Sequence, residues 1–354
     1  MTAAAVLVVV AMLQGVFLTL LVAFLVTRRA LHPGKRDRFA GARVALDEAV
    51  QRWLVAGGSV DDVRAAIRAI PAPARVGYVA HLARGLLPPA QRAALAHALR
   101  DEPWVRQALA GATDTRWSRR LETARALAFV GTEYDRRLLG SLLTDPHPAV
   151  SVAAVSALPG IADDILVAKV VDAYPGLPYV VRGFLDATLR DLRGEVERAL
   201  RTRLGPNAPP RALARWIGLA EALDLLSVVE IAVTLHAHAD ARVRAAVARA
   251  ARRLPRDATV QLLALMAADD DVTVRVDAVR SLGELGVQTV PFLTTSLRDV
   301  SWRVRRQSAL SLAMLGERGR AVLREARNDP DPYVRDVASL VSGLSTGALL
   351  ELTS

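Results

Sequence analysis

The chain has no cysteine among its 354 residues, and its 46 basic residues include only two lysines, Lys35 and Lys169. Without cysteine there is no disulfide framework, no thiolate nucleophile and no thiolate metal site. Aromatic residues are also scarce, at 5% of the chain, whereas Ala, Leu, Val and Arg are abundant. This composition favours helices that pack through small side chains, in one elongated body or in several compact ones.

Catalytic and cofactor-binding motifs are also absent. The sequence contains no P-loop, no GxSxG motif and no dinucleotide fingerprint. His236 and His238 are two residues apart, which places them on different faces of a helix and does not suit a metal. The acidic run from Asp269 to Asp271 lacks the glycine and the distal glutamate of a calcium loop, so helix capping explains it better. We therefore expect no catalytic residue, no metal and no cofactor.

The longest apolar run lies at the N-terminus. Residues 3–26 contain no charged side chain, and these 24 positions exceed the ~20 that a helix needs to cross the hydrocarbon core of a membrane. The run ends in Thr27, Arg28 and Arg29 and has no small-residue cleavage pattern, so it does not look like a secretory signal. We expect residues 1–27 to form an uncleaved transmembrane helix.

A basic segment, residues 28–43, follows this run, and we interpret it as a juxtamembrane linker. It holds one acid, Asp37, against six basic residues: Arg28, Arg29, Lys35, Arg36, Arg38 and Arg43. The positive-inside rule then places the N-terminus outside and the rest of the chain on the cytoplasmic side of the inner membrane. The same charges could also contact anionic lipid headgroups. Residues 44–354 carry 40 basic and 35 acidic residues, and this near balance disfavours nucleic acid as a partner.

A repeat occupies most of the remaining chain. Val-Arg pairs recur at Val243, Val274, Val304 and Val334, at spacings of 31, 30 and 30 residues. In each copy an Asp-containing turn precedes a helix with one apolar face, and a second apolar helix follows. The sequence thus predicts an all-α fold, in which a transmembrane helix precedes an α-solenoid of helix pairs with a period of about 30–31 residues. We assign residues 44–113 to degenerate repeats or an N-terminal cap, 114–346 to the solenoid and 347–354 to a C-terminal tail.

The pattern Asp-x5-Arg-x3-Ala-x2-Leu-x3-Gly at residues 299–316, DVSWRVRRQSALSLAMLG, resembles the short HEAT-like repeats of the phycobilin-lyase type. The segments starting at residues 269 and 329 match it almost as well. The resemblance implies a ladder of hydrogen bonds between Asp and Arg along the stack, with a structural role for these residues. The ladder residues are Asp114, Arg120, Asp269, Arg275, Asp299, Arg305, Asp329 and Arg335.

Other residues beside the ladder remain available for recognition. Arg303 and Arg306 are three apart and share a helix face, and Trp302 is adjacent to them. Trp117 and Tyr179 occupy the same register position as Trp302. These five residues form a candidate edge for binding a protein partner, because aromatic and arginine side chains dominate such contacts. The alternative is that this position only packs a turn on the next repeat, since proline replaces the aromatic residue in two copies.

Together these features favour a non-enzymatic, single-pass membrane scaffold that presents a cytosolic HEAT-like solenoid for docking or assembly of a protein partner. The resemblance leaves other functions open, because similar repeats also serve in assembly factors, chromophore lyases and some enzymes of nucleic acids. The main alternative is a solenoid that binds a polyanion or nucleic acid, as in DNA glycosylase-like proteins. A tetrapyrrole lyase is a further alternative, for which no chromophore chemistry can be found in the sequence.

Overall fold

The computed structural model describes residues 33–85, 87–254 and 256–353. Every regular element in these ranges is helical, and the chain divides into two compact units, Met1–Gly131 and Thr132–Ser354. The predicted transmembrane segment, residues 3–26, lies outside the described ranges. Within them, no helix combines the length and the apolar character that a membrane crossing requires. The prediction of an all-α fold therefore holds for the described part of the chain.

The first unit consists of short helices that pack around one apolar core. Its helices are α2 (Pro33–Val55), α3 (Val60–Ala69), α4 (Ala72–Gly85), α5 (Pro89–Arg100), α6 (Pro103–Leu109), the 3-10 helix η1 (Ala110–Thr113) and α7 (Trp117–Val130). Ser59 caps α3 by accepting a hydrogen bond from the Asp61 N–H, and prolines open α5 and α6, where a missing N–H is tolerated. Ile67, Leu95 and Leu99 form the buried centre of the unit.

A buried carboxylate links two helices of this unit. Glu102 is 5% exposed, and Arg68 donates to both of its oxygens over 2.6–3.1 Å. These hydrogen bonds lower the pKa of Glu102, although its burial acts in the opposite direction. This ion pair joins α3, which contains Arg68, to the start of α6, which follows Glu102. The two residues are 34 positions apart in the sequence, a separation close to the repeat period.

The second unit is built from two rows of helices. The first row is α9 (Pro148–Val155), α12 (Tyr179–Leu189), α14 (Pro210–Ala222), α16 (Ala241–Ala251), α18 (Val272–Glu284), α20 (Trp302–Met314) and α22 (Pro332–Ser342). The second row is α8 (Arg136–Leu143), α11 (Asp164–Ala173), α13 (Arg193–Arg201), α15 (Leu226–Val233), α17 (Arg256–Met266), α19 (Val290–Ser296) and α21 (Gly316–Ala326). The short α10 (Leu158–Ile161), four 3-10 turns (η2–η5) and α23 (Thr346–Thr353) complete it.

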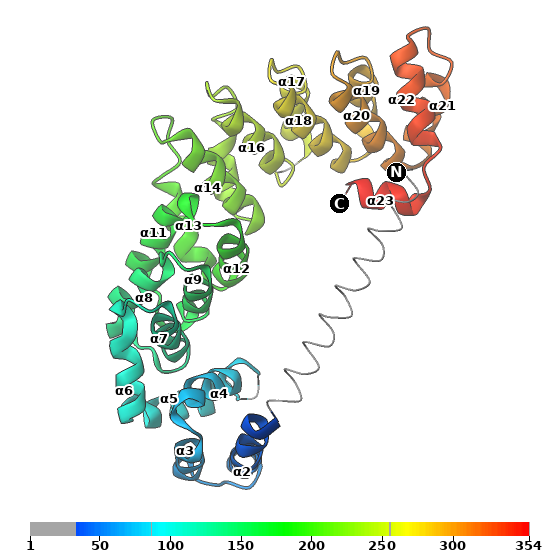
Figure 1. Cartoon of the computed structure of the whole chain (residues 1–354). Coiled ribbons are helices and arrows are strands. Elements are labelled where there is room, and N and C mark those ends of the chain that lie inside the picture. The colour runs from blue at the N-terminus through cyan, green and yellow to red at the C-terminus, as the bar shows by residue number, and fades with distance from the viewer. Residues whose placement is uncertain (1–32, 86, 255, 354) are drawn as a thin grey trace, which may run out of the picture. The chain divides into compact units, whose positions relative to one another are not determined.

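Stacking in chain order identifies this unit as an α-solenoid (Figure 1). In the first row α9 packs on α12, and α14, α16, α18, α20 and α22 pack on one another in succession. In the second row α8, α11, α13 and α15 do the same. The helices α16, α18, α20 and α22 begin at residues 241, 272, 302 and 332, which reproduces the spacing of the Val-Arg pairs. Each helix pair thus covers the apolar face of the pair before it.

Small residues allow the helices to approach closely. A Cβ on Gly283 of α18 would lie 2.5 Å from the hydroxyl oxygen of Ser311 on α20. A Cβ on Gly319 of α21 would lie only 1.9 Å from the carbonyl oxygen of Leu312. Gly316, the first residue of α21, has a positive φ of 70°, which glycine adopts without strain. Packing between neighbouring helices therefore depends on the missing side chains of these glycines.

The ends of the body are more helical than the sequence suggested. Residues 33–43, which we expected in a linker, are part of α2. The segment expected as a C-terminal tail forms most of α23, which packs on α20 and half buries Ala348 and Leu349. Apolar residues in this short segment explain why it folds back onto the stack. The boundary between the two units, between Gly131 and Thr132, falls within residues 114–346, the range that the sequence assigns to the solenoid.

Candidate functional site

The turns before α7, α16, α18, α20 and α22 share a recurring geometry, which four of them base on one aspartate. The carboxylate of Asp269 accepts a hydrogen bond from the N–H two residues later, over 2.8 Å. Asp114, Asp299 and Asp329 do the same over 2.7–3.0 Å. In the turn before α16, His238 replaces the aspartate, and its Nδ1 accepts from the N–H of Asp240 over 3.0 Å. An Asx-type turn thus sets the entry into each of these helices.

An arginine closes each turn from inside the helix that follows. The Nη1 of Arg275 donates to the carbonyls of Asp269 and Asp270, over 2.9 and 3.0 Å. Arg120, Arg244, Arg305 and Arg335 bind the equivalent carbonyls of their own turns. All five arginines therefore satisfy backbone carbonyls that would otherwise lack a partner at the turn.

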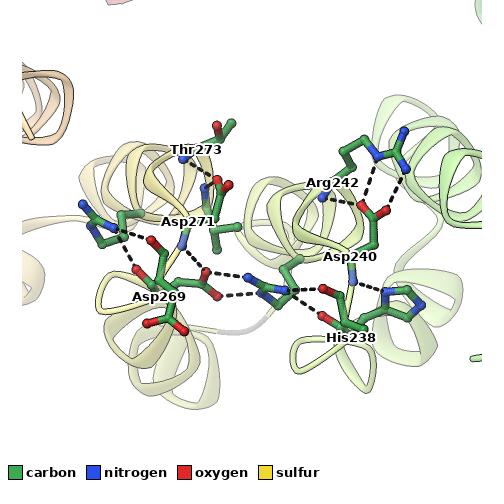
Figure 2. A network of polar contacts seen from close by, with 11 residues as sticks. His238, Asp240, Arg242, Asp269, Asp271 and Thr273 are labelled. Atoms are coloured by element: carbon green, nitrogen blue, oxygen red, sulfur yellow. Dashed lines mark hydrogen bonds and ion pairs between the residues drawn. The ribbon is translucent and has the colours of Figure 1, made fainter.

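The same arginines can also join one repeat to the next (Figure 2). Nε and Nη2 of Arg244 donate to both carboxylate oxygens of Asp269, over 2.7 and 2.8 Å. Arg275 binds Asp299 of the following repeat in the same bidentate way, over 2.8 and 3.0 Å. The side chains of the second pair are each only 12% exposed. Bidentate, charge-assisted hydrogen bonds of this kind are among the strongest polar contacts in proteins.

The electrostatics of these turns favour charged carboxylates. Hydrogen bonds from Arg244 lower the pKa of Asp269 and raise the pKa of Arg244 itself. Beside this pair, Asp240 caps α16 and accepts three hydrogen bonds from Arg242, over 2.7–3.0 Å. These bonds lower the pKa of Asp240 from 3.8 to about 2. The carboxylates of both residues are consequently ionised at neutral pH.

This shift predicts that Asp240 contributes to the loss of stability in acid. Because its pKa is lower in the folded state, Asp240 stabilises the fold above pH 3.8 and loses this contribution as the pH falls toward 2. Asp240→Asn keeps a capping side chain but cannot titrate. We therefore expect urea denaturation to show a smaller loss of stability between pH 4 and pH 2 in the variant than in the original chain. Equal losses in the two proteins would contradict the assignment.

The ladder changes at Arg305. Instead of pairing with Asp329, the Arg305 guanidinium lies 5.9 Å from the centre of the Trp302 ring and 5.0 Å from that of Tyr333. Arg298 binds the Asp329 carboxylate in its place. The buried Nε of Arg305 has no hydrogen-bond partner among the described residues. Here a cation-π contact between α20 and α22 replaces the ion pair seen in the preceding repeats.

Within the second unit, Tyr179 lies apart from the other residues of the predicted recognition edge. Trp117 belongs to the first unit, and Tyr179 of α12 is separated from Trp302 of α20 by three first-row helices. Trp302 is 44% exposed, and Arg303 and Arg306 have no ion pair within the described ranges. Tyr333, 62% exposed, was missed because it lies one register position after the aligned aromatic site. We call Trp302, Arg303, Arg306 and Tyr333 the C-terminal edge.

Other predicted residues have plain structural positions. Of the basic cluster, Arg28 and Arg29 lie outside the described residues, whereas Lys35, Arg36 and Arg38 lie on α2 and Arg43 is exposed there. His147 and His238 each accept a backbone N–H at a turn. In the described part of the chain, no three histidine or acidic side chains gather where they could hold a metal.

The family model for HEAT repeats matches residues 259–341. This segment contains α18 to α21 and most of α17 and α22, including the pair formed by Arg275 and Asp299 and the whole C-terminal edge. HEAT repeats are thus present in the second unit. No curated protein sequence matches the chain.

Several solved structures are similar to the chain at low identity. An engineered protein is 19% identical over 87% of this chain and 91% of its own, with a TM-score of 0.33. The Escherichia coli protein YibA is 13% identical over 74% and 99%, with a TM-score of 0.38. Human deoxyhypusine hydroxylase in complex with glycerol is 19% identical over 85% and 96%, with a TM-score of 0.28. At these TM-scores, none of the three bears on the function of this chain.

Proposed function

We propose that this protein is a non-enzymatic scaffold that docks a protein partner at the inner face of a membrane. In this proposal residues 3–26 cross the membrane and the HEAT-repeat body lies in the cytoplasm. The uncharged length of residues 3–26 and the basic segment after it support the anchor and its direction. HEAT repeats in residues 259–341 support protein docking as the role of the body.

The C-terminal edge is the observation that carries the docking proposal. Trp302 and Tyr333 expose large aromatic surfaces on either side of Arg305, whose guanidinium their rings hold in place. Arg303 and Arg306 lie on the same helix as Trp302, and their charges are not neutralised within the described ranges. Exposed Trp, Tyr and Arg side chains are the residue types that contribute most to protein interfaces. The edge therefore suits a partner with acidic and apolar surface groups.

Crosslinking with mass spectrometry in native membranes tests this function. In the intact chain we expect crosslinks between the body and a protein partner, and we expect the triple variant Trp302→Ala, Arg303→Ala, Arg306→Ala to lose them. Arg318→Ala with Arg327→Ala is the matched control, because these exposed arginines lie outside the edge. A reporter that works only in the cytoplasm should be active when it is fused after Ser354. Unchanged crosslinks in the triple variant would exclude the C-terminal edge as the docking site. Activity of a reporter that works only outside the cytoplasm would overturn the proposed orientation of the chain.

The unpaired charges of Arg303 and Arg306 also support a second candidate, a surface that binds a polyanion. It predicts that the purified protein binds DNA with an affinity that falls steeply with salt, and that the triple variant weakens this binding. Weak DNA binding that is equal in both proteins would favour the protein-docking function.

A further inference from the structure

An open groove runs along the second row of helices between α8 and α11, which lie side by side (Figure 1). Its volume is about 730 Å³. Gly140 and Ser141 of α8 and Thr144, which follows this helix, line the groove with small side chains. A Cβ on Gly140 would already touch Leu166 of α11, at 3.6 Å. Because the side chains of α8 on this side are small, the space between the two helices stays unfilled.

The groove has an apolar floor and an exposed rim. Leu143 of α8 and Leu166 and Val170 of α11 line it from below. At one end stand Tyr134, 88% exposed, and Ile165, 67% exposed. Large apolar side chains that remain this exposed beside a hollow are typical of interaction sites.

The uncompensated charge of the groove is positive. Each acid at the start of α11 or within it already pairs with an arginine: Asp163 with Arg136 at 3.0 Å, Asp164 with Arg198 at 2.7 Å, and Asp172 with Arg203 at 2.6 Å. Glu133, the other acid of the lining, shares Arg136 with Asp163 and lies 3.5 Å from it, so the lining holds three basic side chains against two acidic ones. Lys169 and Arg137 also line the groove, and neither has an ion pair within the described ranges.

We propose that this groove binds an amphipathic helix of a protein partner, with its apolar face on the floor and acidic residues beside Arg137 and Lys169. The proposal rests on the docking function above and adds the chemistry of a partner segment. With eight and ten residues, α8 and α11 are about 12 and 15 Å long, which matches two to three turns of a helix. One side of the groove is open to water, which suits the polar face of such a helix.

The test uses the full-length protein in nanodiscs of phosphatidylcholine and a fluorescein-labelled peptide of about 18 residues, five helical turns. The peptide has leucine on one face and glutamate on the other, and a matched peptide has lysine in place of each glutamate. We expect roughly tenfold tighter binding of the glutamate peptide by anisotropy, since two exposed charges favour it. Arg137→Glu with Lys169→Glu should reverse this preference, whereas the control Arg318→Glu with Arg327→Glu should leave it unchanged.

The two lysines of the chain provide a second readout. We expect the bound glutamate peptide to protect Lys169 from acetylation, measured by mass spectrometry, and to leave Lys35 reactive. Equal affinity for the two peptides, or unprotected Lys169, would overturn the proposal. It would also be overturned if phosphatidylserine vesicles or a single-stranded oligonucleotide protect Lys169 and the peptide does not. None of these results depends on the C-terminal edge, so the scaffold function can fail or stand separately.

Discussion

Replacing Gly319 with alanine is expected to destabilise the C-terminal repeats by about 3 kcal/mol or more. The new Cβ would lie 1.9 Å from the carbonyl oxygen of Leu312, so α20 and α21 would have to separate. Alanine is the better helix former by up to about 1 kcal/mol, but this gain is much smaller than the steric cost. Because each repeat contacts only its neighbours, the loss should concentrate in α20 to α22. Urea denaturation and hydrogen exchange of residues 302–342 measure it.

Gly218→Ala is the matched control for this substitution. Gly218 lies within α14, and a Cβ there would meet no other atom within 4 Å. This variant should be more stable than the original chain by about 0.5–1 kcal/mol. If neither Gly319→Ala nor Gly218→Ala changed the free energy of unfolding, the described close packing of α21 on α20 would be contradicted.

Arg275→Ala is expected to cost about 3 kcal/mol, since it leaves the carboxylate of Asp299 largely buried and unpaired. The substitution also removes the two hydrogen bonds to the carbonyls of Asp269 and Asp270. Arg335→Ala removes the equivalent carbonyl bonds from the last repeat, where no aspartate among the described residues pairs with the arginine. We expect that control to cost only about 1 kcal/mol.

A double-mutant cycle with Arg275→Ala and Asp299→Ala separates the pair from its surroundings. A favourable coupling energy above about 1 kcal/mol would show that the bidentate contact stabilises the stack. A coupling near zero, or equal losses for Arg275→Ala and Arg335→Ala, would contradict the proposed role of the contact.

The repeat could be predicted because stacking imposes the same requirements every 30 residues. Val274, Val304 and Val334 are all fully buried, so their period in the sequence reports the period of the helices. The turn residues follow for the same reason, since each arginine closes its own turn at a constant offset. These features depend only on local spacing, which one sequence displays directly.

Contacts between repeats were harder to predict from the sequence. The resemblance predicts an Asp–Arg ladder along the stack, but the six-residue offset within one copy matches Arg275 with Asp269 and does not identify Asp299 as its carboxylate partner. Arg244 has histidine at the expected position of its own turn and nevertheless pairs with Asp269. The choice between Arg298 and Arg305 as the partner of Asp329 depends on side-chain packing, for which no sequence pattern exists.

The groove was not apparent in the sequence for a related reason. Gly140, Ser141 and Thr144 form no recognisable motif, and their small size matters only because α8 and α11 lie side by side in the fold. The apolar lining of the groove also serves the core, so its hydrophobic pattern resembles that of any other helix pair.

The bidentate contacts also bear on how such a protein can lengthen or shorten during evolution. Arg244 and Arg275 each bind their own turn with Nη1 and present Nε and Nη2 to the aspartate of the next turn. Removal of one period between Asp269 and Asp299 would bring Arg244 opposite Asp299, with donor and acceptor still matched. Duplication of that period would add one further matched contact. Gene rearrangements in register therefore preserve the joints between repeats, whereas a shift of a few residues would break them.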